Sequence, residues 1–166
     1  SQFIAHIIGL DIAKPAVQLA AKKHLNITWL VASGALLPVA DGTMDVVSSL
    51  FSPIPVAEMA RVLKPQGYVL VVRAADTHLY HLRQALFGEV HAHQPDKFLE
   101  ELATHFELVQ QDELRFDLHL AQQALKDLLA MTPYVWKAKP EHRLALEQHQ
   151  HFNTQAAFSL MLLRKR

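Results

Sequence analysis

The feature that most constrains the fold is an alternation of short apolar segments and amphipathic helices in the first half of the chain. Residues 3–10 (FIAHIIGL) form a nearly continuous apolar run, as expected of a strand that is covered on both faces. A helix is expected from Lys14 to His24, because Pro15 suits a first turn and Lys22–His24 suit a carbonyl end. Further strands are expected at residues 27–32, 45–51 and 68–74, the second of them buried, with a helix at 55–63. Strand, helix and strand repeated in this order predict a doubly wound α/β fold with a parallel sheet.

The second half of the chain changes in pattern. Helices are expected near residues 78–87, 95–106, 121–131 and 140–149, and long strands at 106–118 and 156–166. Two late strands separated by helices predict an antiparallel pair at the edge of the parallel sheet. We find no internal repeat, low-complexity segment or linker, so residues 1–166 are expected to form a single domain.

Composition excludes several classes of protein. A chain of 166 residues, 51% of them hydrophobic, is long enough for one well-cored domain. The net charge of zero gives no global electrostatic case for nucleic acid, although local patches can act on a neutral protein. The chain has no cysteine, which excludes disulfides and thiolate metal sites and suits a reducing compartment. Its apolar runs are too short to span a membrane, so we expect a soluble cytoplasmic protein without a membrane partner.

Three features of the first half suit a nucleotide cofactor. Asp11 ends the first expected strand, where a carboxylate can accept both ribose hydroxyls, although an aspartate there is more often a helix cap. Such an acidic residue usually lies about twenty residues after a glycine-rich turn, and no such turn precedes Asp11 here. The loop after the next strand can approach an adenine. The segment KPQG (64–67) is a turn in which Pro65 presets φ and Gly67 is free to take a positive φ.

Taken together and in this order, Asp11, LLPVADGTMD (36–45) and LKPQG (63–67) resemble class I S-adenosylmethionine-dependent methyltransferases. The resemblance covers about the first 75 residues and implies a Rossmann-like fold with S-adenosylmethionine as the cofactor. It places Asp11 and Ile12 at the ribose of the cofactor. It also places Gly34, Ala35 and Leu36 near the adenine, and the segment from Ser48 to Pro53, including Ser49, at the transferred methyl group.

The remainder of the chain resembles the bacterial 23S ribosomal RNA guanine-N1 methyltransferases. Members of that family carry EVHxHxP and MTPxxWxxxPE after the cofactor segments, and here these motifs stand at residues 89–95 and 131–141. The resemblance implies methyl transfer to N1 of a guanine in 23S rRNA, with that RNA as the partner. The helix-rich residues 78–150 would contribute the substrate side.

The same family begins with a zinc-binding cysteine module, followed by the first sheet strand with its glycine-rich turn, and then a helix. All of these would lie before Ser1. The chain is therefore expected to be an N-terminally truncated, inactive C-terminal portion, with zinc confined to the absent module. The missing strand would lie between the strands at Ile7 and Val46, and a homodimer that supplies it is conceivable.

The candidate catalytic residues are Glu89, His91 and His93, with His78 and His81 in the preceding segment, because removal of the N1 proton needs a carboxylate or an imidazole. Glu89 and His93 are four residues apart, so they would share one face of a helix. The alternative is that they are surface residues in a chain with eleven histidines. The HAH segment lacks a third ligand placed by sequence, so no metal site is expected.

Basic and aromatic residues in the second half of the chain are candidates for RNA contacts. Arg73, Arg83 and Lys97 are candidates for the edge of the active cleft. Lys137, Lys139 and Arg143 form a basic group beside Tyr134 and Trp136, and aromatic residues next to cations can stack on unpaired bases. We nevertheless expect Trp136 to be a core residue, with the lysines extending past it to solvent.

Three other functions remain open. A class I methyltransferase of a small molecule would have a closed pocket around residues 53 and 91. A non-catalytic domain that keeps the fold would bind no cofactor. A nicotinamide dehydrogenase is compatible with Asp11 alone, but the LKPQG turn and the antiparallel ending argue against it.

Overall fold

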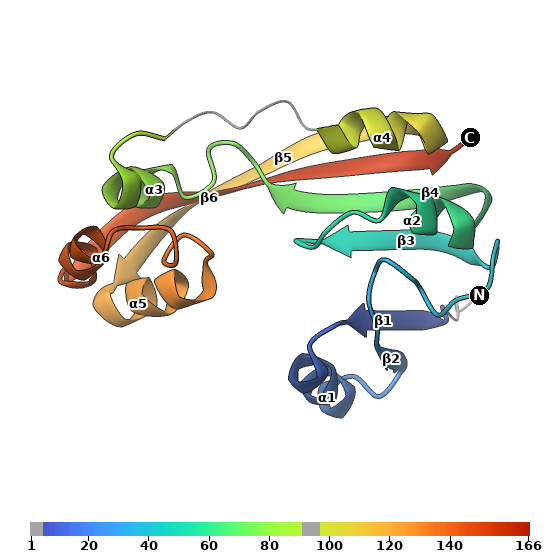
Figure 1. Cartoon of the computed structure of the whole chain (residues 1–166), viewed down its shortest axis with the longest axis horizontal. Helices are drawn as coiled ribbons and strands as arrows, with labels where there is room; N and C mark the ends of the chain where they lie inside the picture. The colour runs from blue at the N-terminus through green and yellow to red at the C-terminus, as the bar shows by residue number, and fades with distance from the viewer. Residues whose placement is uncertain (1–4, 91–96) are drawn as a thin grey trace. The chain divides into compact units, whose positions relative to one another are not determined.

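The computed structural model describes residues 5–90 and 97–166 of the chain. Its strands are β1 (Ile7–Asp11), β2 (Ile27–Val31), β3 (Met44–Leu50), β4 (Leu63–Ala74), β5 (Phe106–Ala121) and β6 (His151–Lys165) (Figure 1). Its helices are α1 (Lys14–Lys23), α2 (Val56–Val62), α3 (Tyr80–Phe87), α4 (Lys97–His105), α5 (Gln122–Met131) and α6 (Pro140–Glu147). Each strand and helix expected from the sequence is present. No helix in the described part of the chain is both long and apolar enough to cross a membrane.

The strands form two separate sheets. Strands β1 and β2 are parallel, with Ile7 opposite Ile27 and Asp11 opposite Val31. The second sheet has the order β3-β4-β6-β5, and Figure 1 shows β6 running opposite to its neighbours β4 and β5. The chain therefore has the predicted α/β fold, and the late strands β5 and β6 form the predicted antiparallel pair at a sheet edge. The expectation that the strands share a single sheet is wrong for the described residues, because β1 and β2 form a sheet of their own. A strand between those at Ile7 and Val46 stays a prediction, and in the structure β1 and β3 belong to different sheets.

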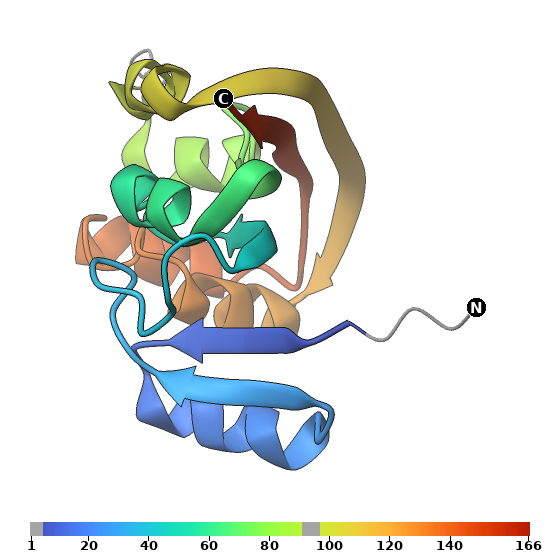
Figure 2. The ribbon, with the colours of Figure 1, turned by 90° about the vertical axis from the view of Figure 1, so that its right-hand side faces the viewer.

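The expected burial of two strands is wrong. No residue of β1 is buried, and Ser49 is the single buried residue of β3. Helix α1 packs against β1 and β2 (Figure 2), and Val17 is its buried residue. Both β1 and β3 are edge strands, so the apolar runs that predicted burial on both faces leave side chains such as Ile7 and Val46 exposed.

Residues cluster into two compact units. Unit 1 comprises residues 1–70, 98–109 and 162–166, and unit 2 comprises residues 71–97 and 110–161. Strands β4, β5 and β6 each contribute residues to both units. That residues 1–166 form a single domain therefore stays a prediction.

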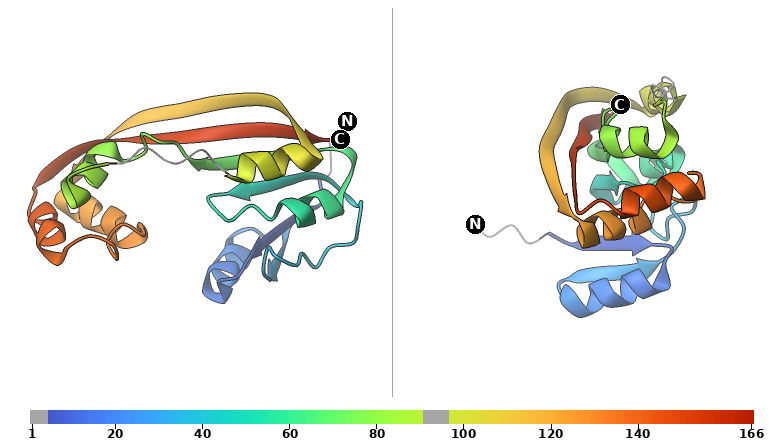
Figure 3. Two further views of the ribbon diagram at one scale, coloured as in Figure 1. Left: turned by 45° about the horizontal axis from the view of Figure 1, so that its top comes forward. Right: turned by 90° about the vertical axis from the view of Figure 1, so that its left-hand side faces the viewer.

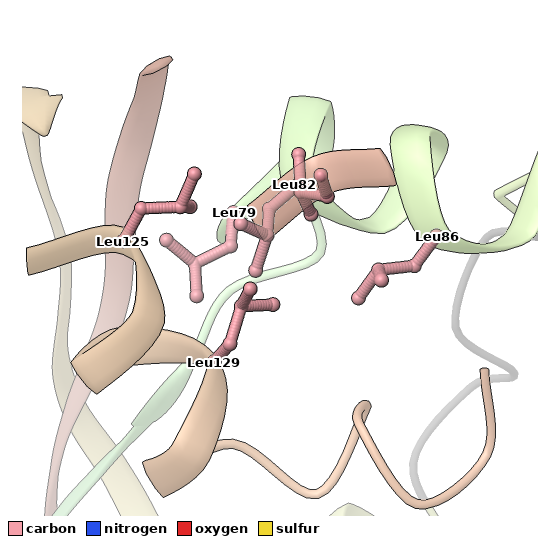
Figure 4. Packing of buried hydrophobic residues seen from close by; sticks show 6 residues of the cluster. Leu79, Leu82, Leu86, Leu125 and Leu129 are labelled. Carbon is pink, nitrogen blue, oxygen red and sulfur yellow. The ribbon is translucent and has the colours of Figure 1, made fainter. Parts of the chain in front are cut away.

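Each unit has its own apolar core. Unit 1 buries side chains of α2, β4, α4 and the start of β5, among them Met59, Leu63, Leu102 and Phe106. In unit 2, helices α3, α5 and α6 lie close together (Figure 3). Their leucines point toward one another (Figure 4) and form a cluster of six buried residues: Leu79, Leu82, Leu86, Leu125, Leu129 and Leu146. We refer to these six residues as the leucine cluster.

Candidate functional site

Asp11 stands at the carboxyl end of β1, beside the end of β2. The Ala32 N–H donates to the Asp11 backbone carbonyl at 3.1 Å, which holds the chain after β2 next to Asp11. The Asp11 carboxylate accepts a hydrogen bond at Oδ1 from the N–H of Ala13, the residue before α1, at 2.7 Å. This bond closes an Asx turn between β1 and α1. It is not a helix cap, because the N-cap position of α1 is Ala13 and no side chain accepts a capping hydrogen bond there. The second carboxylate oxygen of Asp11, Oδ2, accepts no hydrogen bond from the residues that the structure describes, and the side chain is exposed.

The loop after β2 forms a tight turn next to Asp11. The Ser33 hydroxyl accepts from the Ala35 N–H at 3.2 Å, and the Ser33 carbonyl accepts from the Leu36 N–H at 3.3 Å. Two large apolar side chains are left in solvent here, with Ile12 75% and Leu36 74% exposed. An exposed carboxylate, with exposed apolar side chains in the same two loops, fits a nucleoside, whose ribose offers hydroxyl donors and whose base offers apolar faces.

One arginine holds the rest of this loop in place. Arg61 of α2 donates to the carbonyls of Leu37 (2.9 Å) and Val39 (2.8 Å) and to the carboxylate of Asp41. It also forms a two-pronged ion pair with Glu58, at 2.7 and 2.8 Å. Glu58 in turn accepts the Leu37 N–H at 2.6 Å. We call this set of contacts the Arg61 clamp, and it fixes residues 37–41 to helix α2.

The clamp shifts the titration of both of its charged groups. The hydrogen bond from Arg61, followed by that from the Leu37 N–H, lowers the pKa of Glu58 to about 2. The hydrogen bonds to Glu58 and Asp41 raise the pKa of Arg61. Both groups are therefore charged at neutral pH. The spacing of Glu58 and Arg61, three residues apart, indicates a helical pair, but nothing in the sequence indicates that the pair also holds a loop some twenty residues away.

The end of β3 contains a strained residue that sequence reasoning missed. Ser49 is buried, and its Oγ lies 2.9 Å from the Oγ of Ser52. Between them Phe51 has a φ of 55° and an exposed ring. A positive φ is rare for an aromatic residue and is found most often at binding and catalytic sites. Ser52 and Pro53 indicate a turn, but no glycine or asparagine marks position 51, so the positive φ has no local signal in the sequence.

The structure corrects the interpretation of KPQG as a turn, because residues 64–67 lie at the start of strand β4. The positive φ belongs to Gln66, at 64°, and not to Gly67. Gly67 is needed for a different reason. A Cβ at Gly67 would lie 2.9 Å from Leu63 Cδ2, 3.0 Å from the Lys64 carbonyl oxygen and 3.1 Å from the Asp45 carbonyl oxygen. Gly67 therefore permits β3 and the start of β4 to approach each other closely.

The candidate catalytic residues lie in unit 2 or outside the described residues. Helix α3 ends at Phe87, followed by Gly88 with a φ of 78°. Glu89 is exposed and lies two residues after the end of α3. Glu89 is therefore not part of a helix, and the expectation that it shares a helical face is wrong. His91 and His93 lie outside the described residues. Their roles, and that of Glu89, stay predictions.

The two earlier histidines have different surroundings. The Nδ1 of half-buried His78 accepts the Ala157 N–H at 3.1 Å, and its ring lies 4.9 Å from that of Phe158. Burial, together with the charge of Arg83, lowers the pKa of His78. His81 is exposed, with its ring edge-on to Tyr80 at 5.7 Å. The His78 contacts indicate a structural role in unit 2.

The basic residues considered as RNA contacts also differ in their surroundings. Arg83 donates to the carbonyl of Asp76, and Arg73 is half-buried. The side chain of Lys97 lies outside the described part of the chain. Trp136 is 84% exposed, so the expectation that it belongs to the core is wrong.

Comparison with known proteins identifies the fold. The family model described as "Methyltransferase domain" matches residues 1–67. A "SAM-dependent methyltransferase" structure of Methanosarcina mazei aligns with a TM-score of 0.60 at 16% identity, over 96% of this chain and 82% of that one. The chain has the class I methyltransferase fold.

Curated relatives narrow the family further. A Streptomyces fradiae protein named 23S rRNA (guanine(748)-N(1))-methyltransferase is 38% identical over 134 residues, which is 80% of this chain and 48% of that protein. A Bacillus subtilis protein, provisionally named a 23S rRNA (guanine-N(1)-)-methyltransferase, is 34% identical over 140 residues, 83% of this chain and 49% of that protein. The chain is homologous to proteins with these names, and it spans about half the length of each.

Proposed function

We propose that this chain is part of a 23S rRNA (guanine-N1)-methyltransferase that uses S-adenosylmethionine. Similarity to proteins with that name over about four fifths of the chain is the single observation that carries the proposal. The cofactor would supply an electrophilic methyl group on a sulfonium. The methyl would bond to guanine N1, its bond to sulfur would break to leave S-adenosylhomocysteine, and the N1 proton would pass to a base.

The residues of unit 1 are suited to bind the cofactor. Asp11 has a carboxylate oxygen available for a ribose hydroxyl, and Ile12 and Leu36 offer exposed apolar surface. Gly34 and Ala35 belong to the turn that follows β2, which we assign to the adenine. The Arg61 clamp keeps the continuation of this loop in place, so less ordering is required on binding. Ser49 would help shape the segment that faces the methyl group.

The proton acceptor is proposed to come from the segment with Glu89, His91 and His93. A carboxylate or imidazole within hydrogen-bond reach of N1 would take the proton as the methyl bond forms. Zinc in a module outside this chain, a homodimer and a location in the cytoplasm are further proposals. The edge strands β1 and β3 support the homodimer, because each leaves backbone groups for a second copy to pair with.

The first experiment measures S-adenosylmethionine binding by calorimetry. It uses this chain and the longest version of the protein that its gene encodes. Asp11→Asn keeps an acceptor oxygen for the Ala13 N–H but removes the charge, so it separates the local turn from the ribose contact. Asp45→Asn is the matched control, because Asp45 lies at the opposite end of its strand and pairs with Lys64.

We expect Asp11→Asn to weaken binding about tenfold or more, as for the loss of a hydrogen bond to a charged group. Asp45→Asn should leave binding unchanged. The second experiment supplies 23S rRNA and analyses its nucleosides for 1-methylguanosine by mass spectrometry. Failure of the longest version to bind the cofactor would favour a non-catalytic domain. Binding without methylation of the RNA would favour a small-molecule substrate.

A further inference from the structure

The connection between α5 and α6 is a tight, anchored turn. The Thr132 N–H and hydroxyl both donate to the Leu129 carbonyl at 3.1 Å, which closes helix α5. The Lys137 and Ala138 N–H groups both donate to the Tyr134 carbonyl at 3.0 Å. The backbone of residues 134–138 is thus fixed by its own hydrogen bonds.

The inner side of this turn packs on the core of unit 2. Tyr134, Val135 and Ala138 lie against the leucine cluster. The Tyr134 ring also meets the ring of Phe87 edge-on, at 6.2 Å between centroids. Three apolar contacts therefore hold the turn in one orientation, and the residues between them are presented to solvent.

The most prominent of these presented residues is Trp136. Its side chain is 84% exposed, and no described residue makes a ring contact with it. Tryptophan is highly buried on average, because its large apolar surface is stabilised by removal from water. An indole held in solvent on a rigid turn does not contribute to the core of this chain. Such residues are typical of binding surfaces.

The charges around Trp136 indicate what kind of ligand this surface suits. Lys137 and Lys139 are exposed, and neither forms an ion pair with the residues that the structure describes. Arg143 forms an ion pair with Glu147, in which Nε lies 3.3 Å from Oε1. From residue 131 to residue 143, Glu141 is the single carboxylate against three cations. A flat apolar surface beside unpaired positive charges suits a ligand with a flat π face and negative charge.

We propose that Trp136, Lys137 and Lys139 form a stacking platform for an unpaired nucleotide of an RNA. The indole stacks on the base, and the two ammonium groups attract the adjacent phosphates. The nucleotide is unpaired because the bases of a duplex are stacked on their neighbours and do not offer a free face. The proposal rests on the proposed function, since that function makes RNA the substrate, but it assigns residues outside the cofactor site.

The test compares an RNA hairpin that has an unpaired loop with a fully paired duplex of the same length. Binding is followed by quenching of tryptophan fluorescence and by the anisotropy of a labelled RNA. We expect the hairpin, and not the duplex, to quench the emission of the parent chain. Trp136→Ala should lose this quenching and bind the hairpin about tenfold more weakly, within the range for loss of one base stack. Trp136→Phe should recover much of the affinity.

Two control variants separate this surface from general effects. Tyr80→Ala removes another exposed aromatic residue of unit 2 and should leave the affinity unchanged. Lys137→Gln combined with Lys139→Gln should reduce the slope of log affinity against log salt by about 1.4, the value for two contacts to single-stranded RNA. Lys22→Gln combined with Lys23→Gln removes the same charge from the exposed end of α1 and should leave the slope unchanged.

The outcomes also distinguish this proposal from the proposed function. Hairpin binding that is unaffected by Trp136→Ala overturns the stacking platform, even if the protein methylates 23S rRNA. Absence of quenching by the hairpin overturns it as well and favours a protein partner for this surface. Quenching that depends on Trp136 supports the platform. If the longest version of the protein shows this quenching but binds no S-adenosylmethionine, the platform is supported and the methyltransferase proposal is contradicted.

Discussion

Substitution of Gly67 by alanine should destabilise unit 1, although Gly67 does not have a positive φ. The new Cβ would meet two backbone carbonyl oxygens at 3.0 and 3.1 Å and a leucine methyl carbon at 2.9 Å. The leucine can rotate, but the carbonyls of Lys64 and Asp45 can move only with their strands. We therefore expect a loss of about 1–3 kcal/mol, as for other overpacked sites.

Two nearby positions separate this steric effect from backbone strain. Gly42 has a φ of 61°, and a Cβ added there would have no atom within 4 Å, so Gly42→Ala introduces strain without a clash. The strain costs about 1–2 kcal/mol, and the lower entropy of the unfolded alanine chain offsets about 0.5–1 kcal/mol of it. The net loss of unfolding free energy is about 1 kcal/mol. Gln66 already has a φ of 64°. Gln66→Gly should therefore remove backbone strain from the folded state and add conformational entropy to the unfolded state. That variant should be more stable than the parent by a similar amount.

The assay is thermal and urea denaturation followed by circular dichroism. For a chain of this length, 1 kcal/mol corresponds to about 2–4 °C in Tm. We expect Gln66→Gly to be the most stable protein, followed by the parent and then Gly42→Ala. Gly67→Ala should be as stable as Gly42→Ala or less stable. A Gly67→Ala protein as stable as the parent would refute the close approach of β3 to the start of β4. A destabilised Gln66→Gly protein would refute the strain at Gln66.

The remaining predictions concern pH. Because the pKa of Glu58 is lowered to about 2, its ion pair should stabilise the fold fully above about pH 4.5 and lose that contribution as the pH falls toward 2. Urea midpoints between pH 5 and pH 2.5 should therefore fall less steeply in Glu58→Gln, and an unchanged slope would contradict the Arg61 clamp. Burial lowers the pKa of His78 in the folded chain, so stability should decrease as the pH falls below about 6.5, where the unfolded histidine becomes protonated. His78→Gln keeps an acceptor for the Ala157 N–H without titrating, and it should flatten the stability profile between pH 7 and pH 5.

The order and type of the elements can be predicted from the sequence, because apolar periodicity and turn residues are local signals. The sequence predicts helix α1 at residues 14–24, and the structure has it at Lys14–Lys23. The least accurate bounds are those of β4 and β6, which each begin five residues earlier than expected. Hydrogen bonding to a neighbouring strand extends a strand through polar residues such as Lys64 and Asn153, and the sequence of one strand does not contain that information.

The candidate site is predictable only in part. The sequence places Asp11 at a strand end, and the structure has it there, with its carboxylate accepting the Ala13 N–H in a turn. The helix cap that is the more common role of such an aspartate is not formed, because the N-cap position of α1 is Ala13. The Arg61 clamp and the strained Phe51 are missed, because both depend on contacts between segments distant in sequence. The apolar character of Trp136 predicts a core residue, but in its turn the neighbours Tyr134, Val135 and Ala138 occupy the inner side. Residue type therefore predicts burial poorly in a tight turn.

The division of the strands into two sheets has a consequence for handling the protein. Strands β1 and β3 are both edges, and β1 carries no lysine or proline that would discourage pairing with another chain. The exposed Ile7 and Ile8 lie on the same short strand. Edges of this kind promote intermolecular β-pairing, which grows with concentration. Since β2 and β5 form the opposite edges of the two described sheets, the colloidal stability of this chain in solution depends on keeping all of these edges covered.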